Sequence, residues 1–303
     1  MDIKTVTTYL KGLFATLAIL LTMLSPAFGN SGEAYEAMKP DELITSFVVV
    51  SDIHVETNNP TSYKYLYETL EGIKAGKDID AVVYTGDNVM NGQDLENILF
   101  YTAVNAMDPA EKNFVLAGNH DLGNKSGDYN QLLKNYIGFN KLFLGEDVGK
   151  GYFYRVVNGC YFISLISEEP STWGLVIGDE QFAWLEGVLK EADEAGAPIF
   201  VFNHFPIRYE GGSSEKLGAL LKQYGADLFV HGHYHDHVIN SGNFYTSYGI
   251  NSINLTRPTE VNLFEAGEGI VVEVYEGKFI VRVRNFITGE WKEDLLLHPP
   301  FFY

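Results

Sequence analysis

The sequence predicts an α/β fold, and three observations lead to this prediction. Short apolar runs rich in Val, Ile and Phe recur along the chain without polar alternation, which indicates strands buried on both faces. Stretches with helical periodicity separate most of these runs, as expected for sheets covered by helices. Two hairpin signals add antiparallel strands, so we expect mixed sheets.

Each predicted strand ends where polar residues begin. The five apolar runs are 47–50, 81–84, 114–116, 199–202 and 228–230. Ligands in open α/β sheets bind beyond the carboxyl ends of the strands. We therefore expect the polar residues that follow these runs to converge in one crevice.

The clearest predicted helix covers 179–192, where Phe182, Leu185 and Leu189 lie on one apolar stripe. Weaker helical patterns cover 62–75, 93–106, 129–138 and 214–224.

The two hairpin signals lie at Asn158-Gly159 and Glu276-Gly277. The first is a strong two-residue turn signal joining 152–157 to 160–165, and the second joins 270–275 to 278–284. We expect two sheets, the second completed by the C-terminal strands, with no separate domain.

The bulk composition excludes some classes of function. The 303 residues carry a formal charge of -19, so general binding to a nucleic-acid backbone is disfavoured. A small anionic substrate remains compatible, because bound divalent cations dominate the local field. Cys160 is the only cysteine, so no intramolecular disulfide can form, and we expect a buried strand thiol.

The N-terminus has the pattern of a secretory signal. Lys4 and Lys11 precede a short apolar run at 12–24, and small residues favour cleavage before Asn30. We expect a signal peptide at 1–29, a polar leader at 30–43 and one domain at 44–303. The apolar run is shorter than the roughly 20 residues of a membrane span, although an uncleaved anchor is the alternative. The predicted location is outside the cell or in the cell envelope, in a bacterium.

Five polar segments carry the chemistry of the chain. They are Asp52-Ile53-His54, Gly86-Asp87-Asn88, Gly118-Asn119-His120-Asp121, Asn203-His204 and Gly232-His233-Tyr234-His235. Carboxylate, amide oxygen and imidazole are ligands that suit Mn, Fe or Zn. A single segment means little, because an aspartate at a strand end is usually a turn former or a helix cap. Together, the five segments contain five of the eight histidines, which favours a metal site.

The order of these segments (DxH, GD, GNHD, H, GHxH) resembles the calcineurin-like metallophosphoesterase superfamily over roughly residues 47–237. The resemblance implies a four-layer α/β/β/α sandwich of two mixed sheets flanked by helices, with two divalent ions. It assigns one ion to Asp52, His54, Asp87 and His235, and the other to Asp87, Asn119, His204 and His233. A hydroxide bridging the ions would attack phosphorus, and His120 would protonate the leaving alkoxide.

Four further residues are candidates near this centre. Asn88, Arg208 and His231 are candidate substrate contacts, although an ordinary loop position is the default interpretation for His231 and Arg208. Asp121 is a candidate hydrogen-bond acceptor for a ligand histidine, with helix capping as the alternative.

The residue at position 90, here Met90, helps to distinguish between branches of the superfamily. Purple acid phosphatases have a tyrosine at this position, and phosphoprotein phosphatases have an aspartate that orients the catalytic histidine. The chain instead resembles bacterial phosphodiesterase-like members, and the orienting partner of His120 stays open. We expect a secreted phosphohydrolase acting on small phosphoesters and favouring diesters. The alternatives are a phosphomonoesterase or nucleotidase of the same fold, or an inactive metal-stabilised binding protein.

Overall fold

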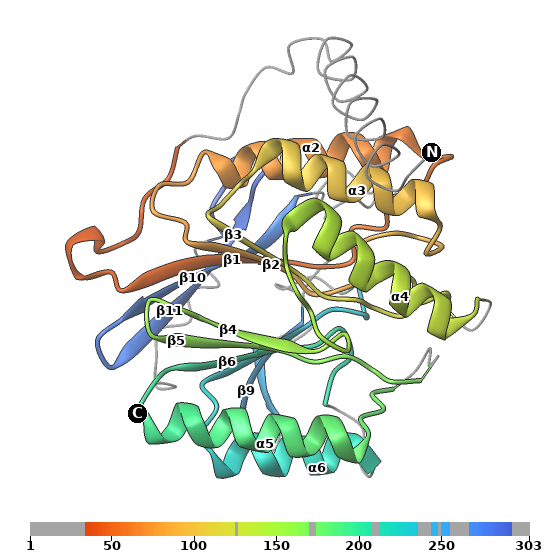
Figure 1. Ribbon diagram of the computed structural model, residues 1–303. Helices are drawn as coiled ribbons and strands as arrows, with labels where there is room; N and C mark the ends of the chain where they lie inside the picture. The colour runs from red at the N-terminus through yellow and green to blue at the C-terminus, as the bar shows by residue number, and fades with distance from the viewer. Residues whose placement is uncertain are drawn as a thin grey trace.

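The protein is a sandwich in which two sheets lie face to face and helices cover both outer faces (Figure 1). The computed structural model describes residues 34–124, 127–169, 174–207, 212–235 and 267–292, and the backbone of 244–247 and 250–254. Helices α2 and α3 cover one sheet, and α5 and α6 cover the other (Figure 1). The predicted four-layer α/β/β/α arrangement is confirmed. The predicted signal segment 1–29 and Arg208 lie outside the described residues.

All five predicted helices and both predicted hairpins are present. The α-helices are α2 (Pro60–Lys74), α3 (Asp94–Met107), α4 (Tyr129–Phe139), α5 (Asp179–Glu194) and α6 (Gly212–Gln223), with a short 3₁₀ helix η1 (Pro40–Glu42) and a short π-helix η2 (Asn140–Leu144). The strands are β1 (Thr45–Val50), β2 (Ala81–Tyr84), β3 (Lys112–Val115), β4 (Phe153–Val157), β5 (Cys160–Ser164), β6 (Ile199–Phe202), β7 (Leu228–His231), β8 (Phe244–Ser247), β9 (Ile250–Asn254), β10 (Glu268–Tyr275) and β11 (Lys278–Asn285).

The first sheet has the strand order β11-β10-β1-β2-β3. Strands β1, β2 and β3 are parallel, and β10 pairs antiparallel with β1. Our expectation that the C-terminal strands complete the second sheet was therefore wrong for the last hairpin. This hairpin covers the edge of β1 that β2 leaves free, so that β1, buried along its whole length, has partners on both sides.

The second sheet has the order β4-β5-β6-β7-β9-β8. Its four central strands are parallel, and an antiparallel strand closes each edge. At the β4–β5 turn, Asn158 and Gly159 have φ of 48° and 82°, which the twist of a two-residue hairpin requires. The Cys160 thiol that follows is buried, as the sequence predicted.

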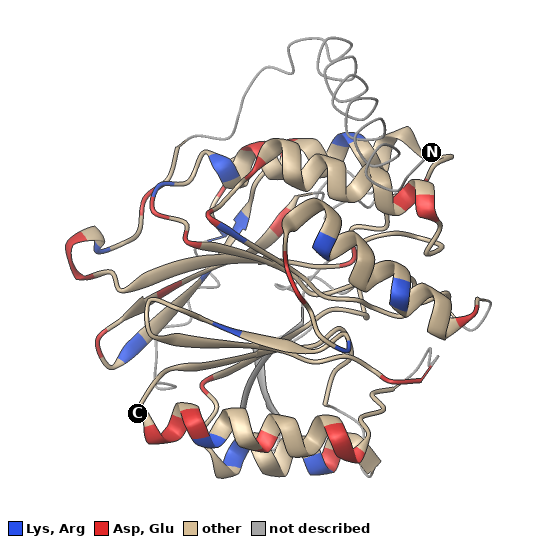
Figure 2. Ribbon diagram, viewed as in Figure 1, with Lys and Arg blue, Asp and Glu red and all other residues tan. Residues whose placement is uncertain are grey.

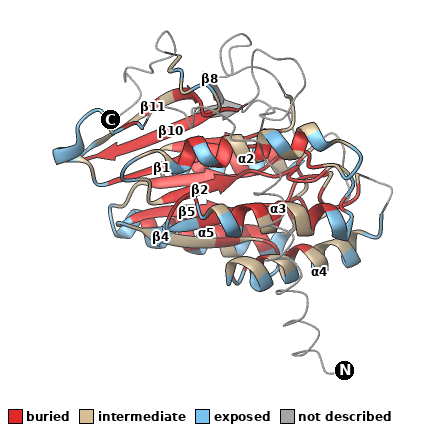
Figure 3. Ribbon diagram, turned by 90° about the horizontal axis from the view of Figure 1, so that it is seen from above, coloured by how far each residue is buried: buried red, intermediate tan, exposed pale blue. Residues whose placement is uncertain are grey.

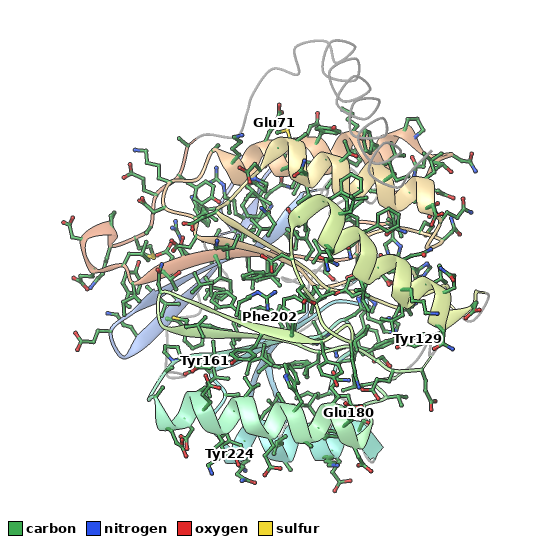
Figure 4. All side chains as sticks on the ribbon, in the orientation of Figure 1. Glu71, Tyr129, Tyr161, Glu180, Phe202 and Tyr224 are labelled. Atoms are coloured by element: carbon green, nitrogen blue, oxygen red, sulfur yellow. The ribbon has the colours of Figure 1, made fainter. Side chains whose placement is uncertain are left out.

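The core consists of two clusters of buried side chains, one on each face of the second sheet, and the first cluster continues through the first sheet to the residues under α2 and α3. Alternate side chains of β6 face opposite ways, so Phe200 and Phe202 join the core between the sheets while Val201 packs under α5 and α6. Phe47 of β1 meets Phe200 edge-on across the sheets, with ring centroids 5.0 Å apart. Figure 3 shows buried strands through the centre, and Figure 4 places Phe202 between the sheets. Burial on both faces explains why these strands are apolar without alternation.

Part of the predicted leader also belongs to the folded structure. Tyr35 is only 5% exposed, and the guanidinium of the buried Arg284 lies 4.3 Å from its ring centroid. Trp291 meets Tyr35 edge-on at 5.5 Å. Other charged residues lie mainly on the outer helices and in loops (Figure 2). Within the described part of the chain, we find no helix with the length and hydrophobicity needed to cross a membrane.

Candidate metal centre

The five polar segments follow strands of both sheets and meet at one edge of the sandwich. Asp52, Asp87 and Asn119 follow β1, β2 and β3 of the first sheet, whereas His204 and His233 follow β6 and β7 of the second. The parallel direction of the strands within each sheet places the segments at the same end. The structure therefore brings together all seven predicted ligand residues.

One group of ligand atoms comprises Asp52, His54, Asp87 and His235, with the four atoms within 4.8 Å of one another. The Nε2 atom of His235 lies 3.1 Å from Asp52 Oδ1 and 3.1 Å from His54 Nε2. The Nε2 atom of His54 also lies 3.8 Å from Asp87 Oδ2. Two imidazole nitrogens facing each other at 3.1 Å share one proton at most, so a cation between them suits this arrangement.

The second group comprises Asp87, His204 and His233, and Asn119 completes it. The Nε2 atom of His204 lies 3.2 Å from Asp87 Oδ2 and 3.0 Å from Asn119 Oδ1. The Nδ1 atom of His233 lies 3.1 Å from the same Asn119 oxygen. Asp87 belongs to both groups, which is the position that a bridging carboxylate requires.

The donor set fits two divalent ions. Ligand atoms held about 2.0–2.2 Å from one ion at tetrahedral or octahedral angles lie about 2.8–3.6 Å apart. The separations of 3.0–3.2 Å given above fall in this range, whereas His54 Nε2 lies slightly farther from the two carboxylates, at 3.8 and 3.9 Å. Asp52, Asp87, His54 and His204 form a buried floor, whereas His233 and His235 are partly exposed. The centre is therefore open to solvent on the histidine side.

Charge pairing on the floor keeps the carboxylates ionised. Burial opposes ionisation of Asp87, but the charge and hydrogen bond of His204 outweigh burial and lower the pKa of Asp87. The pKa of His204 is raised in return, against the effect of burial, to about 9. Its Nδ1–H donates to the Thr85 carbonyl oxygen at 3.2 Å, which leaves Nε2 facing Asp87. A metal ion binding there would displace the Nε2 proton.

The backbone conformation at the centre is unusual. Five of the seven predicted ligand residues have positive φ, namely Asp52 (54°), His54 (50°), Asp87 (51°), His233 (79°) and His235 (54°). Positive φ is uncommon outside glycine and costs of order 1 kcal/mol or more per residue. Such strain clusters at functional sites, where the surrounding fold fixes it. The sequence carried no signal for this feature.

Two motif glycines are explained by close approach. A Cβ on Gly118 would lie 2.2 Å from Asp87 Oδ1, and one on Gly232 would lie 2.1 Å from Asp52 Oδ2. Both distances are far below van der Waals contact, so these positions exclude a side chain. Gly118 does not have positive φ, so close approach rather than backbone conformation explains this glycine.

The orienting partner of His120 is a backbone group. Its Nδ1–H donates to the Met90 carbonyl oxygen at 2.6 Å, because a carbonyl oxygen can only accept. The backbone N–H of His120 donates to Asp87 Oδ1 at 2.7 Å, and Nε2 lies 4.0 Å from Asp87 Oδ2. His120 therefore lies beside both ligand groups with Nε2 turned towards them. Reasoning from side chains could not find this partner, since every residue has a carbonyl group.

Asp121 has a different environment from the two that we considered. Its carboxylate accepts the backbone N–H groups of Gly118 at 2.8 Å, Val89 at 3.1 Å and Asn88 at 3.2 Å. These contacts tie the loop after β2 to the loop after β3. Burial, with the nearby Asp87 charge, raises the pKa of Asp121 to about 7. Asp121 thus fixes the spacing between Asp87 and Asn119 rather than capping a helix.

The other candidate contacts are not turned to solvent. The Nδ2 group of Asn88 donates to the Leu116 carbonyl oxygen at 2.7 Å, and this residue is 2% exposed. His231 is fully buried, with Nδ1 2.9 Å from the Gly232 carbonyl oxygen. This geometry does not favour direct contact of either residue with substrate. Arg208 lies outside the described residues, so its predicted contact stays a prediction.

The solved structures that are similar to this chain include the following two, and the first of them shares the fold. A dimetal phosphatase from Danio rerio superposes with a TM-score of 0.62 at 16% identity, covering 80% of this chain and 97% of that protein. GAP50 of Plasmodium, the anchor in the inner membrane complex, has a TM-score of 0.46 at 18% identity, covering 81% and 86%. Among curated proteins, no sequence matches this chain.

The sequence model of the calcineurin-like phosphoesterases matches residues 45–237, which is well over half of the chain. This range begins at β1 and ends just beyond His235, so it contains every residue of the two ligand groups. Members of this family use two divalent metal ions, in agreement with the two groups. The chain belongs to the calcineurin-like phosphoesterase family and is a metal-dependent phosphoester hydrolase.

Proposed function

We propose that this hydrolase is exported and prefers phosphodiesters. The observation behind the diester preference is the chemical type and charge of the described side chains around the two ligand groups. They are carboxylates, amides, imidazoles and the aromatic ring of Phe205, which lies 4.7 Å from the His233 ring. Neither ligand group contains a lysine or arginine among the residues that the structure describes. A diester carries one negative charge, whereas a monoester carries nearly two at pH 7, so this site suits the diester.

Individual residues of the site have separate roles in the proposed reaction. When bound, the two ions would polarise the phosphoryl group and lower the pKa of water towards neutrality. Asp87 holds both ligand groups together, and the partly exposed histidines leave the substrate a path from solvent. His120, whose side chain is 21% exposed, is held by Met90 at Nδ1 and presents Nε2 for proton transfer to a leaving alkoxide.

A comparison of two chromogenic esters tests the preference. We expect chelation to abolish hydrolysis of bis-p-nitrophenyl phosphate and Mn²⁺ to restore it. For the Mn²⁺-loaded enzyme, kcat/KM should be at least tenfold higher for this diester than for p-nitrophenyl phosphate. A higher kcat/KM for the monoester would replace the proposal with a phosphomonoesterase or nucleotidase. Two bound ions without turnover of any phosphate ester would indicate an inactive binding protein.

Export rests on the N-terminal pattern, in which Lys4 and Lys11 precede the apolar run 12–24. Outside the cytoplasm, the substrates would be small phosphodiesters such as nucleotides or phospholipid headgroups. N-terminal sequencing of the mature protein should begin near Asn30. An intact N-terminus on an envelope-bound protein would indicate an anchor, and confinement to the cytoplasm would contradict export.

A further inference from the structure

The side chain of Asn124 lies between two residues of the metal centre. Its Oδ1 accepts the Nδ2 group of Asn119 at 3.2 Å, and its own backbone N–H donates to the Asn119 carbonyl oxygen at 2.7 Å. Its Nδ2 also lies 3.4 Å from His120 Nε2. We propose that Asn124 is a positioning residue that holds the Asn119 amide with its oxygen towards the second metal ion.

The orientation of the Asn119 amide matters because its two ends differ chemically. The oxygen is a ligand with lone pairs, whereas the NH₂ group only donates hydrogen bonds and cannot bind a cation. Asn119 Oδ1 now lies 3.0 Å from His204 Nε2 and 3.1 Å from His233 Nδ1. A flip of the amide would turn the NH₂ group towards this cluster. It would also set the Asn119 oxygen against Asn124 Oδ1, and two acceptors repel.

The backbone explains which residue types fit position 124. Its φ of 41° lies in the left-handed region, which Asn, Asp and Gly tolerate best. Glycine would keep this backbone but lose the acceptor for Asn119. Aspartate would keep both the backbone and the acceptor, and would replace the donor that faces His120 with a second carboxylate oxygen that carries negative charge. The two substitutions therefore separate the acceptor from the shape of the loop.

Residues that hydrogen-bond to metal ligands often control the affinity for the metal. Loss of a hydrogen bond that orients a ligand typically weakens metal binding by about 10- to 100-fold. Because the hydrogen bonds of Asn124 within the described residues join it to Asn119, with His120 beside it, the effect should fall on the ion that Asn119 binds. A general disturbance of the loop would instead weaken both ions, since His120 N–H bonds the shared Asp87.

The test is a calorimetric titration of metal-free protein with Mn²⁺, with the bound metal counted independently. For Asn124→Gly we expect one of the two Mn²⁺ sites to weaken by about tenfold or more, and the other to change little. For Asn124→Asp we expect each of the two Mn²⁺ association constants to be at least about a third of the wild-type value. The matched control is Asn158→Gly, an exposed turn residue with φ of 48° in the β4–β5 hairpin, which should bind like wild type.

Unchanged Mn²⁺ affinities in Asn124→Gly would overturn the inference, as would equal weakening in Asn124→Gly and Asn124→Asp. Weakening of both ions alike would show that the loop, rather than the Asn119 amide, had been disturbed. The inference rests on the metal centre of the proposed function, and the wild-type titration separates the two. Absence of Mn²⁺ binding by wild type removes both, whereas two wild-type sites that Asn124→Gly leaves unchanged remove the inference alone.

Discussion

Adding one methyl group at Gly118 should disable the metal centre. The new Cβ would lie 2.2 Å from Asp87 Oδ1, 2.4 Å from the Asp87 backbone nitrogen and 2.8 Å from His204 Cγ. To regain ordinary contact, the Asp87 carboxylate must retreat by about 1 Å, and a misplacement of that size costs about 100-fold in rate. Crowding of this kind also destabilises a protein by about 1–3 kcal/mol. Because Asp87 belongs to both ligand groups, both metal sites should weaken.

The Gly118→Ala variant is measured in three ways. Mn²⁺ titration gives the two affinities, steady-state hydrolysis at saturating Mn²⁺ gives the rate, and denaturant unfolding of the metal-free protein gives the stability. The matched control is Gly187→Ala, since a Cβ at this exposed position in α5 meets nothing within 4 Å. Removing a helical glycine there should stabilise the fold by about 0.5–1 kcal/mol and leave the rate unchanged. Wild-type Mn²⁺ affinities in Gly118→Ala, with a rate within threefold, would refute the close-approach argument.

Three further substitutions and one labelling treatment have distinct expected outcomes. Asp87→Ala should lose both metal ions, whereas His120→Ala should keep both and lose about 10²- to 10⁴-fold in rate, as metal analysis and kinetics will show. Burial raises the pKa of Cys160 to about 12, so at pH 8 its thiolate fraction is of the order of 10⁻⁴, and a thiol reagent should label it only in denaturant. Tyr35→Ala should lower the free energy of unfolding by about 3–5 kcal/mol in a denaturant titration and leave Mn²⁺ affinity unchanged, because it removes packing around Arg284.

Each of these expectations has a contrary result. Equal metal loss in Asp87→Ala and His120→Ala would make His120 a ligand. Rapid labelling of native Cys160 at pH 8 would mean that β5 opens readily. A Tyr35→Ala variant as stable as wild type would show that the leader residues near Tyr35 do not contribute to the fold.

Much of the fold was predictable because its signals are local. Apolar runs of three or four residues became strands, and the stripe of Phe182, Leu185 and Leu189 became the buried face of α5. The Asn158-Gly159 turn has the φ angles that its residue types favour. The partner of the last hairpin was not predictable, since pairing of β10 with β1 joins segments far apart in the chain. Nothing in the sequence of either strand specifies which sheet it joins.

The types of residue that form the metal centre could also be predicted from the sequence. Carboxylate, amide and imidazole ligands in a fixed order identified a family of metal-dependent phosphoesterases, and residue chemistry is independent of conformation. The backbone groups that hydrogen-bond to residues of the centre could not be predicted, because nearly every position carries both a carbonyl and an N–H group. Only the fold shows that Met90 orients His120 through its carbonyl, and that Asp121 accepts N–H groups from two loops.

The sequence alone therefore determined the fold class, the ligand set and the expectation of two divalent ions. Tertiary structure decided how two sheets bring strand ends 181 residues apart, such as His54 and His235, to within 3.1 Å. It also decided that Asp52, Asp87 and three histidines adopt positive φ, and that Gly118 leaves no room for a side chain. The physical reason is that ligand chemistry belongs to single residues. Convergence, strain and close approach arise only when distant segments pack together.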